Sequence, residues 1–177
     1  MQDLQATLTE HFELGEWTQQ RDDLAFVTVA REHLRGVLHH LREHEGFTHL
    51  VLLTAVDWIE DGQFQLTYLL SNRVAALDLG VRVLLARDGA QMDTIHDLWP
   101  TAATYQRELR EMFGIGFPGS PRVDEEFILE GWQGPPPYRR DFDTLKFSQE
   151  QFAERAGRET KDPAAHMKQK LYPQGDR

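Results

Sequence analysis

Three histidines in the first third of the chain have the spacing with which one helix can present imidazole rings to a metal ion. His40 and His44 are four residues apart, and His33 falls on nearly the same helical stripe. A solvated polar face opposite a stripe of leucines gives the same spacing, and no further ligand is in view nearby. We therefore favour a polar helix face. A small metal protein that uses these histidines is the alternative from another functional class.

The sequence lacks the local signatures of common catalytic and nucleotide-binding sites. Neither the G-x-G-x-x-G of a dinucleotide site nor the Gly-rich turn of a P-loop is present, and no G-x-S-x-G marks a nucleophilic serine. The absence of cysteine excludes disulfides, thiolate zinc sites and the ordinary ligands of iron–sulfur clusters. We therefore expect no catalytic, cofactor-binding or metal-binding residues in this chain.

Charged residues in two other segments have the chemistry of contacts between proteins. Glu108 and its neighbour Arg107 lie in a segment with charge on one side and apolar residues on the other. Glu108 is either a surface acid or an anchor for a basic group of a partner. Arg139, Arg140 and Asp141 follow a run of prolines, and arginine forks bind carboxylates at two points, which suits a docked interface. A solvated turn is the other interpretation.

The composition is that of a globular, acidic protein. Apolar residues make up 40% of the chain and charged residues 27%, close to the globular average. Residues 1–117 contain twice as many acidic as basic residues, and the net charge of the whole chain is −10. Because nucleic acids are bound by clustered Lys and Arg, and anionic membrane surfaces repel acidic proteins, we exclude both as direct partners.

Neither a targeting segment nor a membrane span is expected. The N-terminal sequence carries acids instead of a basic region and has no apolar core of the length of a secretory signal. The longest apolar run, residues 49–58, is far shorter than the ~20 residues that cross a bilayer. We expect a soluble chain, made in the cytoplasm, that reaches a membrane only through a complex.

The spacing of apolar residues predicts the order helix, strand, helix, three strands, helix. Apolar residues recur every three to four positions in the helices and alternate in most of the strands. The run at 49–58 is continuously apolar, which is typical of a strand covered on both faces. The expected elements are a helix that includes residues 4–12, a strand at 24–29, a helix at 31–45, strands at 49–58, 64–70 and 77–86, and a helix at 101–113.

These elements predict an α+β fold. A strand joined through a helix to a parallel neighbour and followed by antiparallel hairpins gives a mixed, largely antiparallel sheet with helices mainly on one face. We assign residues 1–117 to this head domain. Residues 118–177 begin with a segment rich in Pro and Gly that has no regular period, so we expect an extended Pro-rich C-terminal tail. Its aromatic residues, Trp132 among them, favour a tail that lies against a partner over a free linker.

Three stretches carry the pattern of a known family. The stretch DTIHDLWPTAATYQRELREMFGIGF is similar to W-x-x-A-x-x-x-E-R-E-x-x-D-M-F-G-I-x-F, and residues 132–142 are similar to W-x-G-x-P-x-R-K-D-F. Upstream, an apolar strand ends in Asp57 and Trp58 before a hairpin. The chain therefore resembles the 30-kilodalton (C) subunit family of respiratory complex I. The loop from Gly119 to Glu126 departs from the family pattern, because acids stand where a pair of arginines is usual.

The resemblance implies a non-catalytic structural subunit of the peripheral arm of a proton-pumping NADH:quinone oxidoreductase. It implies docking on the quinone-site (49-kilodalton-like) subunit and the iron–sulfur subunits, at the cytoplasmic face of the inner (plasma) membrane. NADH, FMN, iron–sulfur clusters and quinone are then expected on those partners. The equivalent subunit of a membrane-bound nickel–iron hydrogenase or formate hydrogenlyase is the alternative. The expected partner-binding residues are Arg107, Glu108, Trp132, Arg139, Arg140 and Asp141.

Overall fold

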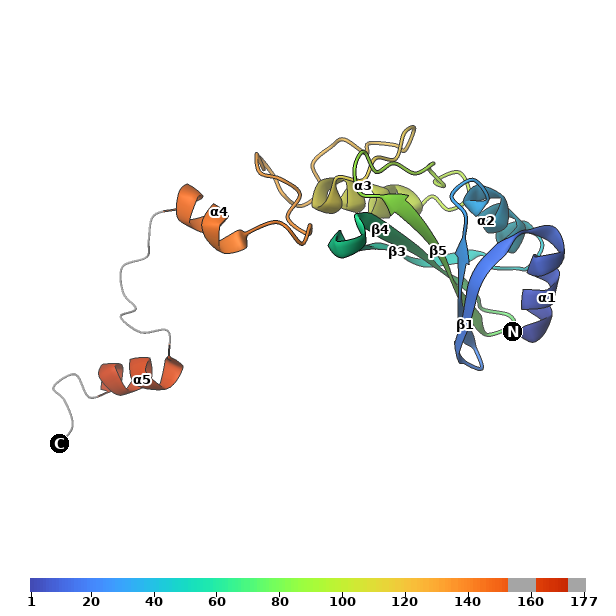
Figure 1. Ribbon diagram of the computed structural model, residues 1–177, viewed down its shortest axis with the longest axis horizontal. Coiled ribbons are helices and arrows are strands. Elements are labelled where there is room, and N and C mark those ends of the chain that lie inside the picture. Colours follow the sequence, from blue (N-terminus) through green and yellow to red (C-terminus); the bar gives the residue numbers. More distant parts are fainter. Residues whose placement is uncertain (153–161, 172–177) are drawn as a thin grey trace. The chain divides into compact units, whose positions relative to one another are not determined.

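The computed structural model describes residues 1–152 and 162–171 and divides the chain into two compact units. The first unit, Met1–Phe142, contains the sheet with α1, α2 and α3 (Figure 1). The second, Asp143–Arg177, contains α4 (Thr144–Gln151) and α5 (Pro163–Leu171). Over the described residues, none of the helices combines the length and the apolar character needed to span a bilayer.

Five strands form one mixed sheet in the first unit. β2 and β5 are parallel, and the other neighbouring pairs are antiparallel. The α+β fold with a mixed, largely antiparallel sheet, predicted from the sequence, is confirmed. The strand order is β1 (Leu14–Arg21), β2 (Leu24–Val29), β5 (Leu77–Ala86), β4 (Gln63–Asn72) and β3 (His49–Trp58).

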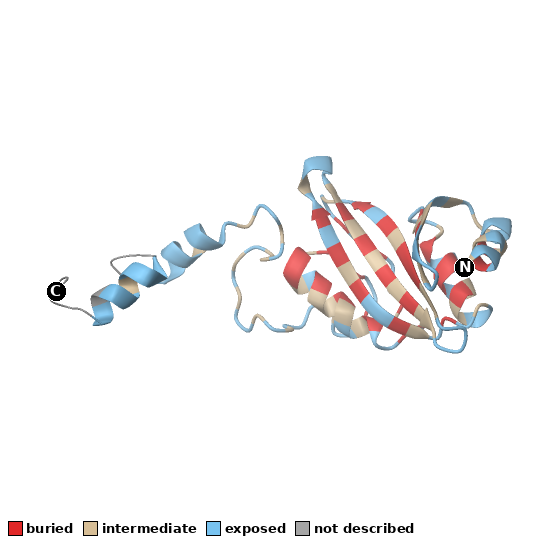
Figure 2. Ribbon diagram, turned by 90° about the horizontal axis from the view of Figure 1, so that it is seen from below, coloured by how far each residue is buried: buried red, intermediate tan, exposed pale blue. Residues whose placement is uncertain are grey.

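One face of the sheet carries the hydrophobic core. Alternate residues of β4 are buried, among them Phe64, Leu66 and Tyr68, because residues two apart in a strand point to the same side. Figure 2 shows this alternation along the strands. The helices α2 (Leu34–Glu43) and α3 (Ala102–Phe113) contribute buried residues to the same core, as their apolar stripes predict.

β1 is a strand that the sequence pattern did not predict. It is an edge strand with mostly exposed, polar residues such as Glu16 and Gln19, so it shows no alternation. Its backbone pairing with β2 holds it in the sheet. The helix before it, α1 (Gln2–His11), was expected from its leucines, and Leu4 and Leu8 are buried in the common core.

β3 is an edge strand with one open face, which differs from the expected strand covered on both faces. Leu52, Val56 and Trp58 are each 40% to 43% exposed. Leu84 of β5 is 42% exposed and lies on the same side, because Gln65 pairs with both Val56 and Leu84. The sequence of β3 is mostly apolar because the side chains on the open face of the sheet are apolar as well as those on the core face. We call Leu52, Val56, Trp58 and Leu84 the open-face patch.

The boundary between the two units falls after Phe142, not after Phe117 as expected from the composition. Residues 118–142 contain no helix or strand, only turns, bends and irregular backbone. Their backbone groups are nevertheless hydrogen-bonded to the head, for example to the carboxylates of Asp57 and Glu111. A segment without regular structure can pack in this way when other groups satisfy its polar backbone atoms. Of the expected tail, residues 153–161 and 172–177 lie outside the described residues.

A side chain at Gly80 would collide with a packed ring. A Cβ atom there would lie 2.3 Å from Cδ1 of Phe26, and the guanidinium of Arg82 covers the same ring at 4.0 Å. We expect Gly80→Ala to lower the free energy of unfolding by about 1–3 kcal/mol, because the ring must leave a well-packed position. Urea unfolding followed by circular dichroism measures the change.

Gly36→Ala is the matched control for this prediction. Gly36 lies inside α2, and a Cβ atom there would make an ordinary contact of 3.4 Å with the Phe12 ring. Alanine is favoured over glycine inside a helix by about 1 kcal/mol, so this variant should gain stability. Equal losses in the two variants would contradict the packing argument.

Candidate partner-binding site

Asp57 is a buried carboxylate at the C-terminal end of β3. It is 4% exposed, and its two oxygens accept hydrogen bonds from Nε and Nη2 of Arg87, at 2.9 and 3.2 Å. The sheet register explains their proximity, since Asp57 pairs with Phe64 and Phe64 pairs with Leu85. Arg87 follows Leu85 by two residues and so points to the same side. A buried charge is tolerated when it is paired and hydrogen-bonded, and this pair meets both conditions.

The same pair fixes the segment that follows the prolines. Nη2 of Arg87 also donates to Oδ1 of Asp141 at 2.6 Å, and the backbone N–H of Arg140 donates to Oδ2 of Asp57 at 2.9 Å. The guanidinium of Arg140 forms an ion pair with Glu60 in the 3-10 helix η1 (Ile59–Asp61). We call Asp57, Arg87, Arg140 and Asp141 the Asp57 cluster. It joins one end of the sheet to residues 140–141.

Burial and charge act in opposite directions on the carboxyl of Asp57. Desolvation alone would raise its pKa, but the hydrogen bonds from Arg87 and from the Arg140 backbone outweigh burial, and the pKa is lowered. The pKa of Asp141 is also lowered, chiefly by its hydrogen bond from Arg87. The pKa of Arg87 is raised by its hydrogen bonds to both carboxylates. At neutral pH the cluster is therefore an ionic cross-link within the first unit.

The C-terminal end of α3 is covered by the same segment. Gly114 ends the helix with φ of 74°, a left-handed conformation that glycine adopts readily. The backbone N–H of Tyr138 donates to the carbonyl of Met112 at 3.0 Å. Nε of Arg139 donates to the carbonyl of Phe113 at 2.7 Å. These bonds satisfy two of the carbonyls that a helix end leaves without partners inside the helix.

Glu111 of α3 anchors a second part of the segment. Its carboxylate accepts hydrogen bonds from the backbone N–H groups of Phe127, Ile128 and Leu129, at 2.7 to 3.2 Å. Burial would raise the pKa of Glu111, but these three bonds and the charge of Arg107 together lower it. The carboxylate therefore holds residues 127–129 beside α3 in its charged form.

Three of the predicted partner-binding residues bind their own chain. The Arg139 side chain, the Arg140 backbone and guanidinium, and the Asp141 carboxylate all contact the head, as described above. Trp132 is partly buried, and its Nε1 donates to the carbonyl of Pro135 at 3.0 Å. The chemistry expected of a docked interface thus also serves contacts inside this chain.

Arg107 and Glu108 lie side by side on α3 in different surroundings. The guanidinium of Arg107 lies 5.0 Å from the centre of the Phe127 ring, in a cation–π contact. Glu108 is partly buried, and among the described residues its carboxylate has no hydrogen bond or ion pair. The binding of a partner by these residues remains a prediction.

Sequence reasoning missed Arg87 and Glu111 as anchors and gave Asp57 no partner. A signal for Asp57 was available, because it is the one acidic residue in a strand that is mostly apolar, and a buried acid requires a cation. Arg87 is bonded to residues 30 and 54 positions away, and Glu111 to residues 16 to 18 positions away. No local pattern reports contacts of that kind.

Of the three histidines singled out in the sequence, His40 and His44 lie in a cluster of rings with His11 of α1, whereas His33 precedes α2 at its N-cap position and is not part of the cluster. The ring centroid of His40 lies 5.0 Å from those of His44 and of His11. Nε2 of His40 is 3.5 Å from Oε1 of Glu45, and burial lowers the pKa of His40. Across residues 1–152 and 162–171, no group of three or more His, Cys, Asp or Glu residues is arranged to hold a metal ion.

The fold and the site define a small α+β protein in which a buried ionic cluster ties an irregular, proline-rich segment to the end of a sheet. The family model described as respiratory-chain NADH dehydrogenase, 30 Kd subunit, matches residues 27–148, which is more than half of the sequence. The chain belongs to this family.

Individual relatives agree with this assignment. The C subunit of the NADH-quinone oxidoreductase of Moorella thermoacetica is 31% identical over 120 residues, which cover 68% of this chain and 80% of that protein. The C/D subunit of the same kind of enzyme in Acidiphilium cryptum is 33% identical over 134 residues, covering 70% of this chain and 22% of that protein. A chain of the membrane-bound sulfane sulfur reductase, an archaeal respiratory membrane complex, has a TM-score of 0.81 at 27% identity, covering 91% of this chain and 96% of that one.

Replacing Asp57 by asparagine should weaken the fold at neutral pH. Arg87 then lacks its buried partner, and we expect the free energy of unfolding to fall by about 3 kcal/mol. The folded-state pKa of Asp57 lies below the unfolded value of about 3.9, so its stabilising contribution is complete above that value and is lost as the pH falls through the folded-state pKa. The free energy of unfolding of Asp57→Asn should therefore fall less than that of the wild type as the pH is lowered. Urea unfolding between pH 7 and pH 3 measures both effects.

The control for Asp57 is Asp124→Asn. Asp124 forms an ion pair with Arg110 in which the two side chains are 77% and 46% exposed. Exposed pairs contribute about 0–1 kcal/mol, so this variant should remain close to the wild type. If the free energy of unfolding of Asp57→Asn were also close to the wild-type value at neutral pH, the Asp57 cluster would not be an important ionic cross-link.

Removing the carboxylate of Glu111 should loosen residues 127–129 without unfolding the sheet. We expect Glu111→Ala to speed hydrogen exchange of the amides of Phe127, Ile128 and Leu129 by about tenfold, since each loses an acceptor worth about 1 kcal/mol or more. Glu108→Ala on the same helix is the control and should leave these rates unchanged. Unchanged rates in Glu111→Ala would show that the segment is held by other contacts.

Proposed function

We propose that this chain is a non-catalytic structural subunit of the peripheral arm of a proton-pumping NADH:quinone oxidoreductase. It docks on the quinone-site subunit and supports electron transfer from NADH to quinone by keeping its partners in position. The observation that carries this proposal is the uncovered apolar surface of α4 and α5, in a chain that belongs to the 30 Kd subunit family.

The second unit has the properties of a segment that folds against another protein. α4 buries none of its residues, and Leu145 and the adjoining Phe152 are 61% and 68% exposed. Met167 and Leu171 of α5 are also more than half exposed. Asp143 caps α4 by accepting a backbone hydrogen bond, so the helix start is specified locally. Burying such side chains contributes about 25 cal/mol per Å2, which a partner surface would provide.

The names of the relatives support a particular partner. Relatives with the double designation C/D carry both names in one chain, and this chain matches about a fifth of such a protein. A D-type chain is therefore the first candidate for the quinone-site partner, with the iron–sulfur subunits beside it. The open-face patch, Arg107 and Glu108 are further surfaces of the first unit that such partners would cover.

In this proposal the redox chemistry belongs to the partners. NADH, FMN, iron–sulfur clusters and quinone are bound by the other subunits, and this chain binds none of them. It lies at the cytoplasmic face of the inner (plasma) membrane and is attached there through the complex. Its own contribution is geometric, because electron transfer between centres depends on how the chains that carry them are positioned.

A second candidate is the equivalent subunit of a related respiratory membrane complex with other substrates. The similarity to a chain of the sulfane sulfur reductase complex, with a TM-score of 0.81 over 91% of this chain, supports this candidate. The equivalent subunit of a membrane-bound nickel–iron hydrogenase or of formate hydrogenlyase is a further form of this second candidate. The structural role is the same, but the electron donor differs. Reduction of the purified complex by NADH, hydrogen or formate, together with an assay for reduction of sulfane sulfur by the complex, distinguishes the candidates.

The proposal is tested by capturing the full-length chain from gently solubilised membranes of its own organism. We expect it to bring down a D-type subunit and iron–sulfur subunits, identified by mass spectrometry. The double variant Leu145→Asp, Phe152→Asp should capture at least about tenfold less partner, because both exposed apolar side chains become charged.

Val74→Asp is the matched control for the capture experiment. Val74 is 100% exposed in the turn between β4 and β5, so the same change of chemistry there should leave capture unaffected. A wild-type chain that is recovered as a well-behaved monomer, with an ordered second unit and no companion subunits, would contradict the proposal.

A further inference from the structure

A pocket of about 420 Å3 lies beside the C-terminal end of α3. Its walls come from three stretches of the first unit and from two arginines, Arg110 of α3 and Arg139 of the proline-rich segment. The three stretches are residues 89–91, the turn after α3 with residues 114 and 116–119, and residues 123–124. The volume is within the range of about 300–1,000 Å3 that is usual for ligand sites.

Four of the twelve residues that line the pocket are glycines, so they line it with backbone alone. The N–H of Gly116 donates to the carbonyl of Ala90 at 2.8 Å, and the carbonyl of Gly116 accepts from the N–H of Met92 at 2.9 Å. A Cβ atom at Gly114 would lie 3.0 Å from Nη2 of Arg139, so a side chain there would push the guanidinium aside. The glycine turn therefore keeps the pocket open and lets Arg139 approach it.

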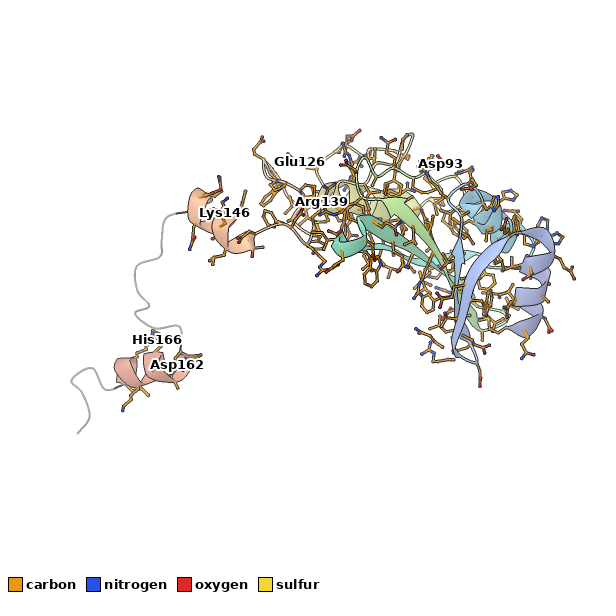
Figure 3. The ribbon with its side chains drawn as sticks, in the orientation of Figure 1. Asp93, Glu126, Arg139, Lys146, Asp162 and His166 are labelled. Atoms are coloured by element: carbon orange, nitrogen blue, oxygen red, sulfur yellow. The ribbon has the colours of Figure 1, made fainter. Side chains whose placement is uncertain are left out.

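Arg139 brings a partly unused guanidinium to this pocket. Its Nε donates to the carbonyl of Phe113, but its two terminal nitrogens have no hydrogen bond or ion pair within the described residues. Figure 3 shows Arg139 beside α3. The carboxylate of Asp141 is near enough for Arg139 to lower its pKa, yet it is bonded to Arg87. The fork of Arg139 thus lacks the two-point partner that a guanidinium usually takes.

Arg110 gives the pocket a second positive charge, and its ion pair with Asp124 can be exchanged for one with another carboxylate. Its Nε donates to Oδ1 of Asp124 at 3.1 Å, in a pair whose carboxylate side chain is 77% exposed. Such an exposed pair contributes little and can be exchanged for another carboxylate. The lining therefore carries two arginines and one acid in a chain whose net charge is −10.

We propose that this pocket receives a carboxylate side chain, from an Asp or Glu residue in a segment of a partner subunit, and holds it on the fork of Arg139. Arg110 contributes the second charge at the rim. A partner is favoured because the pocket is polar and glycine-lined, which suits an extended peptide with one acid more than a bulky apolar ligand. The inference rests on the proposed structural role and specifies one of its contacts.

Nuclear magnetic resonance of the full 15N-labelled chain tests the recognition directly. The probe is the capped peptide acetyl-Gly-Ser-Glu-Ser-Gly-amide, and the same peptide with Gln in place of Glu is the control. We expect the Glu peptide to shift the amides of Gly114, Gly116 and Gly119 and the Nε–H of Arg139 at millimolar concentration, and the Gln peptide to leave them in place. No shift with the Glu peptide, equal shifts with both, or equal shifts with inorganic phosphate would overturn the proposal.

Two variants and a control connect the response to the arginines. Arg139→Gln should weaken the Glu-peptide response about tenfold or more, the loss expected for a charged hydrogen-bonded contact. Because Arg139 also binds the end of α3, Arg110→Gln provides a test that leaves that bond intact, and it should weaken the response as well. Arg122→Gln is the control, since Arg122 pairs with Glu125 outside the pocket lining.

Capture from solubilised membranes separates this proposal from the proposed function. Weaker capture of the D-type or iron–sulfur subunits by Arg139→Gln and Arg110→Gln, with Arg122→Gln unchanged, supports the pocket. Full capture by both variants would overturn the pocket and leave the structural role intact. Failure of the wild-type chain to capture any companion subunit would instead overturn the structural role.

Discussion

The carboxylate of Asp57 is buried at the end of β3 and needs a cation. The contacts that satisfy it determine how this end of the first unit is built. Asp57 accepts two hydrogen bonds from Arg87 and a third from the backbone of Arg140. Arg87 in turn holds Asp141. Buried ion pairs add little net stability compared with apolar residues of similar volume, but they are demanding in geometry. We infer that the cluster mainly specifies where the proline-rich segment lies.

The position of that segment connects the sheet to α3. Residues 138–139 cap the carbonyl end of the helix, and Glu111 of the same helix holds residues 127–129. A stretch with no helix or strand is thereby attached at three places through charged side chains. Its order depends on the protonation and pairing of a few carboxylates, whereas the order of the sheet depends on apolar packing. The two parts of the unit should therefore respond differently to acid and to loss of core volume.

Apolar periodicity in the sequence predicted the elements that pack against the core. The stripes of α2 and α3 and the alternation of β4 each reflect one buried face, and the structure has helices and a strand at these places. β1 was missed because an edge strand needs only backbone pairing, which leaves no mark on its side chains. The composition changes after Phe117, whereas the compact units divide after Phe142, because the carboxylates of Asp57 and Glu111 bind backbone groups of residues 118–142. Arg139, Arg140 and Asp141 were expected to bind a partner. Within this chain Arg140 and Asp141 form ion pairs and Arg139 binds the end of α3, contacts with distant residues that no local pattern predicts.

The open-face patch has a consequence for how the protein is made. β3 stands at the edge of the sheet over ten residues, and on its outward side it shows Leu52, Val56 and Trp58 to water. Long apolar edges of this kind are templates for pairing with other chains. A copy synthesised in excess of its companions would then be prone to self-association or to proteolysis. Balanced translation of the subunits, or a chaperone that shields β3 until assembly, would protect the cell from orphaned copies.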